Sequence, residues 1–242
     1  MEEKVDEVAF TRLVTEDIAR QVKLDGARVY ATGFSNGAMM VYRLACELAD
    51  QIAAIAPVSA APQMLSCNPS QPVSVIHFHG DADIFYPYEG GAGVLDDNPD
   101  RMSVEESIAL WVGFDGCPSQ AQESQDGNIL HRTYAPCQGG TAVELYKILG
   151  GEHAWPGGEA VNEAVGGTRG CTHVRELLFP MATVAFQTMV GWGQDDAPQQ
   201  PDGTSPQRPY FLDGCKAWAS DGEVVVQLYP QFAVRRSGDA PQ

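Results

Sequence analysis

The stretch Gly33-Phe34-Ser35-Asn36-Gly37 sets a serine between two glycines, where one sequence pattern gives way to another. An apolar run over residues 28–34 predicts a buried strand, and apolar residues at helical spacing over 36–50 predict a helix. A G-x-S-x-G between a strand and a helix is typical of the sharp turn called a nucleophile elbow. The turn needs small flanking residues and exposes the serine oxygen at the N-terminus of the helix. Ser35 is therefore a predicted nucleophile, with the backbone N–H of Asn36 as an oxyanion donor.

A serine alcohol is a weak nucleophile without a base, so Ser35 predicts an acid and then a histidine further along the chain. Asp83 follows a predicted strand at 73–78, and His153 lies in a glycine-rich loop after another at 143–149. Groups at the carboxyl ends of parallel strands share one edge of the sheet. The order predicts a catalytic triad in which His153 is the base and Asp83 orients it.

Asp81 is an alternative to Asp83 as the acid. We favour Asp83, because Asp81 is nearer the end of the strand, where a carboxylate caps the turn.

His77 and His79 suggest a second alternative, because H-x-H-x-D begins the zinc motif of metallo-β-lactamase-type hydrolases. Ala82 occupies the place of its last histidine, and a zinc site needs three or more ligands. The simpler prediction has no metal, with His77 in the sheet and His79 hydrogen-bonded within the turn.

Strands that alternate with helices predict an α/β fold with a mainly parallel sheet flanked by helices. The predicted helices cover residues 5–24, 36–50, 103–114 and 175–192, and the predicted strands cover 28–34, 52–59, 73–78 and 143–149. Ser103 and Glu106 predict a capping box. Pro57 predicts the end of its strand, because proline is disfavoured inside a central strand.

Composition excludes several classes of protein. The net charge is −17, from thirty-two acidic and fifteen basic residues, so we predict no binding to nucleic acid or to anionic membranes. No apolar stretch is long enough to cross a bilayer, and the first residues do not form a signal peptide. We predict no cofactor.

Six cysteines permit disulfides, and none has C-x-x-C spacing. Cys117 and Cys137 bracket a polar, glycine-rich segment that a disulfide between them would close. For Cys46 and Cys67, a disulfide and two buried thiols are equally good predictions. Two more cysteines, at positions 171 and 215, are left over.

Several ordered motifs resemble the poly(3-hydroxybutyrate) depolymerase and feruloyl/acetylxylan esterase group of α/β-hydrolases. They cover residues 33–40, 44–47, 79–91 and 150–157, within a resemblance that extends over roughly 5–192. The resemblance implies a triad of Ser35, Asp83 and His153 and a Cys117–Cys137 disulfide. It also implies an extracellular or periplasmic enzyme that acts on polyesters or on acyl groups of plant polysaccharide.

The chain departs from this group at both ends. Such enzymes begin with further strands and an oxyanion loop that nothing here matches, so we expect an N-terminally truncated catalytic domain over 1–192. The second oxyanion donor has no counterpart here, and residues 28–34 would form an exposed sheet edge. A linker over 193–209 and a tail over 210–242 follow. The one strand predicted in this tail, 223–229, is expected to cover a sheet edge, within the chain or in a homodimer.

These observations predict a serine carboxylic ester hydrolase for short-chain, polyester, hydroxycinnamoyl or acetyl esters. The alternative is a scaffold of the same fold that binds such esters with little or no catalysis. Trp155, Tyr86 and Tyr88 are predicted to line the mouth of the site, since aromatic rings suit a hydroxycinnamoyl group or a sugar face. Packing within a lid is the other explanation for these rings.

Overall fold

The computed structural model describes residues 6–21, 24–26, 28–64, 66–94 and 98–156, and three later strands. The helices are α1 (Glu7–Gln21), α2 (Asn36–Glu47) and α3 (Val104–Phe114), with the short 3₁₀ turn η1 (Gln138–Gly140). The strands are β1 (Val29–Phe34), β2 (Ala54–Val58), β3 (Ser74–Gly80), β4 (Gln122–Asp126), β5 (Ile129–Tyr134), β6 (Val143–Ile148), β7 (Tyr210–Leu212), β8 (Cys215–Ser220) and β9 (Glu223–Leu228). The helix predicted over 175–192 and the linker over 193–209 lie outside the described residues.

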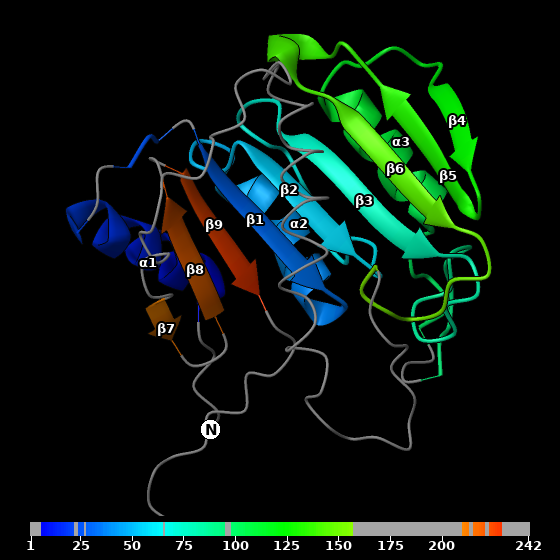
Figure 1. Ribbon diagram of the computed structural model, residues 1–242, viewed down its shortest axis with the longest axis horizontal. Coiled ribbons are helices and arrows are strands. Elements are labelled where there is room, and N and C mark those ends of the chain that lie inside the picture. Colours follow the sequence, from blue (N-terminus) through cyan, green and yellow to red (C-terminus); the bar gives the residue numbers. More distant parts are fainter. Residues whose placement is uncertain are drawn as a thin grey trace, which may run out of the picture.

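All nine of these strands form one sheet, in the order β4-β5-β6-β3-β2-β1-β9-β8-β7 (Figure 1). The five central strands, β6, β3, β2, β1 and β9, are parallel, and an antiparallel pair extends the sheet on each side. The predicted α/β fold with a mainly parallel sheet is confirmed in this central part.

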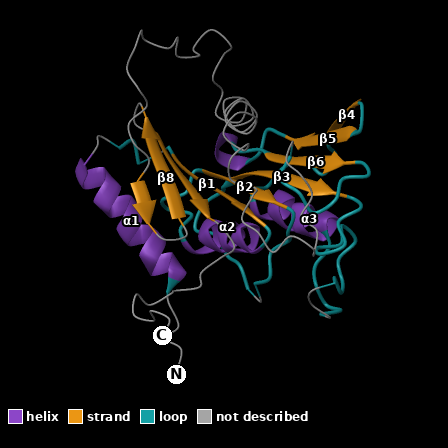
Figure 2. Ribbon diagram, turned by 60° about the horizontal axis from the view of Figure 1, so that its bottom comes forward, coloured by secondary structure: helices purple, strands orange, loops and turns teal. Residues whose placement is uncertain are grey.

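The strands bury side chains on both faces. Alternate residues of β1 and β3 contribute to two separate clusters, as the period of two along a strand requires. One cluster includes apolar side chains of α1, α2 and α3, so these three helices cover the same face of the sheet (Figure 2). The described helix α3 begins with the predicted capping box between Ser103 and Glu106.

The tail contributes three strands, β7, β8 and β9, where the sequence predicts one. β9 pairs in parallel with β1, with Ala31 opposite Val226. The prediction that residues 223–229 cover a sheet edge is therefore confirmed, within the chain itself. The strand β8 has only a short, irregular apolar pattern, Cys215-Lys216-Ala217-Trp218, which explains why the pattern gave no sign of it.

Two further details differ from the predictions. Pro57 lies inside β2 and does not end it. The register between β2 and β3 pairs residues 54, 55 and 58 and passes over 56 and 57, so this ladder does not need the N–H that proline lacks. The hairpin β4–β5 was not predicted, because every residue of β4 is polar and exposed.

Two disulfides are present. Cys117–Cys137 closes the segment that contains the hairpin, and Cys46–Cys67 joins the end of α2 to the loop before β3. The first agrees with the sequence prediction, and the second decides between its two alternatives in favour of a disulfide. In the part of the chain that the structure describes, no helix is long and apolar enough to cross a membrane.

Candidate active site

The predicted site residues follow three of four neighbouring strands. Ser35 follows β1, Asp83 follows β3, and His153 follows β6. Because these strands are parallel, their carboxyl ends lie at the same edge of the sheet. Ser59, which follows β2, completes this row.

Ser35 occupies the turn between β1 and α2 in a strained conformation. Its φ of 57° and ψ of −121° are unusual for a residue with a side chain. A Cβ on Gly33 would collide with the backbone of Gly37, so the two ends of the turn approach as closely as the motif predicts. Asn36 is the first residue of α2, and its N–H therefore has no acceptor within the helix.

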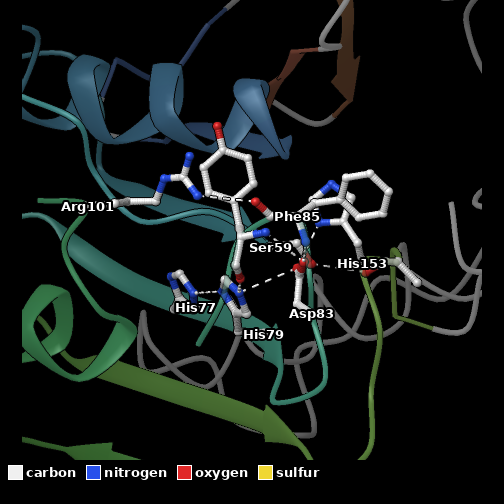
Figure 3. Close-up of polar contacts among 9 residues, drawn as sticks. Ser59, His77, His79, Asp83, Phe85, Arg101 and His153 are labelled. Atoms are coloured by element: carbon white, nitrogen blue, oxygen red, sulfur yellow. Dashed lines mark hydrogen bonds and ion pairs between the residues drawn. The ribbon is translucent and has the colours of Figure 1, made fainter. Parts of the chain in front are cut away.

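Asp83 and His153 form a buried hydrogen bond. The distance from His153 Nδ1 to Asp83 Oδ2 is 2.7 Å, and the two residues are 4% and 3% exposed. A carboxylate only accepts, so this hydrogen bond needs a proton on Nδ1, and in a neutral ring Nε2 then carries the lone pair. The structure thus brings together two of the three predicted residues (Figure 3).

The second oxygen of Asp83 fixes the turn that follows it. Asp83 Oδ1 accepts hydrogen bonds from the backbone N–H groups of Phe85 and Tyr86, at 2.9 and 2.8 Å. Asp81, the alternative acid, is exposed and accepts a hydrogen bond from the N–H of Gly150. The structure therefore places Asp83, and not Asp81, against His153.

Aromatic side chains surround the imidazole of His153. The ring centroids of Phe34, Phe85 and Tyr86 lie 4.6, 5.1 and 5.9 Å from that of His153. Because Phe34 immediately precedes Ser35, this contact brings the end of β1 next to the histidine. Trp155 is half-buried and meets Phe34 edge to face, with 6.1 Å between centroids.

Tyr88 lies elsewhere than predicted. It is 2% exposed, its hydroxyl donates to Glu105 at 2.6 Å, and its ring lies edge to face on His79. Burial raises the pKa of its phenol, with Glu105 adding to the shift. The structure therefore places Tyr88 in the core, where it does not line the mouth of the site.

Two residues without a recognisable sequence signal, Ser59 and Arg101, support the site. Ser59 has a φ of 55°, and its hydroxyl donates to the carbonyl of Ala154, which follows His153. Arg101 is 5% exposed, donates to the carbonyl of Phe85 at 3.2 Å, and stacks 4.4 Å from the ring centroid of Tyr86 (Figure 3). Each holds one of the two loops that carry His153 and Asp83.

His77 and His79 adopt the arrangement that the sequence analysis prefers to a zinc site. His77 lies within β3, and Nε2 of His79 is 2.8 Å from the carbonyl of Tyr86 in the following turn. Among the residues that the structure describes, no three His, Cys, Asp or Glu side chains converge in a way that could hold a metal ion.

Comparisons with known proteins point to esterases. The chain is 34% identical over 156 residues to feruloyl esterase B of Piromyces equi, covering 62% of this chain. It is 27% identical over 147 residues, 58% of the chain, to the bifunctional acetylxylan esterase/xylanase XynS20E of Neocallimastix patriciarum. These matches span 29% and 20% of the two relatives, so the chain corresponds to less than a third of either.

Two further similarities are weaker. Residues 129–187 match the model of a family described as a protein of unknown function, DUF2889. The solved structure of an acetyl xylan esterase from Aspergillus awamori is 17% identical, with a TM-score of 0.40, and the alignment covers 61% of this chain and 62% of that one.

Proposed function

We propose that this chain is a serine carboxylic ester hydrolase in which Ser35, His153 and Asp83 form a catalytic triad. The observation that carries the proposal is the buried hydrogen bond from His153 Nδ1 to Asp83 Oδ2, beside the strained turn that holds Ser35. A histidine fixed through Nδ1 presents a basic Nε2, which is what a serine alcohol requires.

The proposed reaction has two halves. The Ser35 oxygen forms a bond to the carbonyl carbon of the ester while its proton passes to Nε2 of His153. The carbon–oxygen bond to the alcohol then breaks, and His153 protonates the departing alcohol. Water repeats the sequence on the acyl-serine and releases the acid. The N–H of Asn36 donates to the oxyanion in both halves, and one such donor typically contributes about 10²–10³ in rate.

We propose feruloyl or acetyl esters of plant polysaccharide as the substrate class. Relatives bearing the names feruloyl esterase and acetylxylan esterase support this choice, as do the aromatic rings of Trp155 and Tyr86 near His153. Polyesters, the other class that the resemblance implies, are kept as an outcome of the test. Two disulfides support the proposal that the protein works in an oxidising, extracellular or periplasmic setting.

The test is hydrolysis of p-nitrophenyl acetate, then of ethyl ferulate, acetylated xylan and poly(3-hydroxybutyrate). Ser35→Ala should lower kcat by about 10⁶, as removal of a triad nucleophile does. A fluorophosphonate probe should label the wild type but not this variant. Folded protein with no activity and no labelling would refute the proposal.

Labelling of Ser35 without turnover above the rate in water would support the other reading of the sequence, a binding scaffold that lacks efficient catalysis. Its basis is that the sequence identifies Asn36 as an oxyanion donor and has no counterpart of the second donor.

A further inference from the structure

Three buried side chains that the proposed reaction does not use lead from α2 to the turn after β3. The hydroxyl of Tyr42 is 2.6 Å from Nδ1 of His77, and Nε2 of His77 is 3.0 Å from Nδ1 of His79. Nε2 of His79 is 2.8 Å from the carbonyl oxygen of Tyr86. The three side chains are at most 1% exposed, so these hydrogen bonds have no competition from water.

The contact between His79 Nε2 and the carbonyl of Tyr86 fixes the direction of all three hydrogen bonds. A carbonyl oxygen only accepts, so Nε2 of His79 must carry a proton. In a neutral ring Nδ1 is then an acceptor, and it receives the Nε2–H of His77. By the same argument Nδ1 of His77 accepts the hydroxyl proton of Tyr42. The result is one set of tautomers in which each N–H or O–H points toward the turn after β3.

Burial keeps the rings of His77 and His79 neutral. Desolvation lowers the pKa of His77 well below its ordinary value, and the neighbouring His79 lowers it further. Desolvation, together with the nearby His153, also lowers the pKa of His79, and the hydrogen bond to Tyr86 and the charge of Asp83 only partly offset this. A neutral His79 does not compete as a cation with His153 for the Asp83 carboxylate.

This series of hydrogen bonds ends at Tyr86, whose backbone N–H contacts Asp83. Nε2 of His79 lies 3.5 Å from Asp83 Oδ2, the oxygen that accepts from His153, so the His79 ring borders the carboxylate (Figure 3). The same N–H anchors the carbonyl of Tyr86, whose own N–H donates to Asp83 Oδ1. His79 is therefore next to one oxygen of Asp83 and is linked to the other through the backbone of Tyr86.

We propose that His79 is a positioning residue for Asp83, held in a single orientation by His77 and Tyr42, and that it acts on catalysis through the Asp83–His153 hydrogen bond. This inference rests on the proposed function, because it needs a triad to position. His79 touches no reacting atom. It fixes where the imidazole of His153 points.

The test compares His79→Leu with His79→Gln in the full chain, using p-nitrophenyl acetate. His79→Leu removes the N–H, and we expect kcat to fall by about 10²-fold, with KM changed less than about threefold, since a misplaced group costs this much without altering binding. His79→Gln keeps an N–H near the position of Nε2 and should recover most of that loss. In proton NMR the low-field resonance of His153 Nδ1–H should persist in His79→Gln and be lost or shifted in His79→Leu.

Tyr42→Phe is the second variant, because it removes one hydroxyl at the far end of the chain and preserves the ring. It should lower kcat less than His79→Leu and move the same resonance. His131→Gln is the matched control: His131 pairs with Glu144 on β5 and β6, outside this chain of hydrogen bonds, and its loss should leave kcat unchanged.

Four outcomes are distinct. Equal kcat in His79→Leu and the wild type, or equal losses in His79→Leu and His79→Gln, would overturn the positioning role while Ser35→Ala still abolishes activity. If His79→Leu fails to fold, an unchanged kcat and resonance in Tyr42→Phe would overturn it. If Ser35→Ala retains activity, the proposed function itself fails. A kcat loss at constant KM, rescued by His79→Gln, supports the inference.

Discussion

Asp81 and Asp83 stand two residues apart and have opposite surroundings. Asp81 is exposed and lies 3.9 Å from Nζ of Lys147, in addition to accepting from Gly150. Asp83 is buried. One of its carboxylate oxygens accepts hydrogen bonds from the backbone of the following turn, and the other accepts from His153. Replacing either aspartate by asparagine preserves the shape of the side chain and removes its charge, so the two variants distinguish the acid from the residue that caps the turn.

Asp83→Asn should lower kcat by about 10⁴, because an amide can donate to Nδ1 and stabilise the wrong tautomer of His153. Asp81→Asn, the matched control, should stay within a few-fold of the wild type. Steady-state hydrolysis of p-nitrophenyl acetate measures both. Similar losses in the two variants would contradict the assignment of Asp83 as the acid.

Asp115 gives a prediction on stability rather than activity. It is fully buried, and one carboxylate oxygen accepts from the N–H of Val73 at 3.2 Å. Desolvation raises its pKa to about 6, above the ordinary value of about 3.9. The folded state therefore holds a proton that the unfolded chain releases between about pH 4 and 6, so this residue makes stability fall as pH rises through that window.

Asp115→Asn should remove this part of the pH dependence. Urea unfolding at several pH values between 4 and 7 should show a flatter profile in the variant than in the wild type. Parallel profiles would show that the carboxyl does not titrate with a raised pKa.

At the level of single residues, the pairing of Asp83 with His153 was predictable and the burial of side chains was not. The order Ser35, Asp83, His153 followed from what a serine nucleophile requires, and the structure brings the last two into contact. Tyr88 was misplaced because a tyrosine beside a catalytic loop has the same sequence pattern in the core as at the surface. Ser59 and Arg101 gave no signal, because their contacts with the loops are set by the sheet and not by neighbouring residues.

At the level of elements, the end of β3 and the loop after β6 pack closely against each other at two glycines, Gly80 and Gly151. A Cβ on Gly80 would collide with the backbone of Gly151, and Ala82 N–H donates to the carbonyl of Gly151 at 2.9 Å. These contacts bring the loop of Asp83 and the loop of His153 together. The close approach requires glycine at position 80.

Gly80→Ala should therefore destabilise the protein by about 1–3 kcal/mol, the usual cost of overpacking, and lower kcat at the same time. Gly113→Ala is the control, since Gly113 lies on the exposed side of α3 and a Cβ there meets nothing within 4 Å. Alanine at that helical position should stabilise by about 0.5–1 kcal/mol. Denaturant unfolding and kcat of both variants test this contrast.

The elements that were predictable have an apolar pattern of one of two kinds. The helices α1, α2 and α3 have apolar residues at helical spacing, and the strands β1, β2, β3 and β6 are runs in which most or all residues are at least half-buried. The hairpin β4–β5 lacks such a pattern, since β4 is exposed throughout and β5 is half-buried along its length. Its pairing is set by β6 and by the Cys117–Cys137 bond, which are tertiary contacts.

At the level of the whole molecule, β9 occupies the side of β1 that would otherwise be an open edge. Because β9 lies between β1 and β8, each of its paired N–H groups has a neighbour strand to donate to. Val225 pairs with Tyr30 on one side and with Trp218 on the other.

Val225→Pro should lower the free energy of unfolding by about 1–3 kcal/mol, the cost of an unsatisfied backbone group, and should promote self-association through β1. Val225→Thr keeps the N–H and the β-branched shape and should differ little from the wild type. Urea unfolding and light scattering distinguish the two. An unchanged Val225→Pro variant would contradict this pairing.

The two disulfides, Cys46–Cys67 and Cys117–Cys137, each close a loop next to the sheet. They link residues 21 and 20 positions apart, and loops of this length stabilise by about 3 kcal/mol each in the chain-entropy account. Replacing Cys117 and Cys137 together by alanine should lower the free energy of unfolding by about that amount. Adding reductant should destabilise the wild type more than this double variant, and equal effects would contradict a contribution from Cys117–Cys137.

The parallel pairing of β1 with β9 also constrains how the protein is made. About 190 residues separate the two strands, and a ribosome adds about 5–20 residues per second, so roughly 10–40 s pass before β9 exists. During that time β1, which leads into the serine turn, does not have β9 beside it. Co-translational folding can build the sheet from β1 toward β6, but its completion waits for the later segment. The interval between the synthesis of β1 and the synthesis of β9 is therefore the period in which this pairing of the sheet cannot yet form.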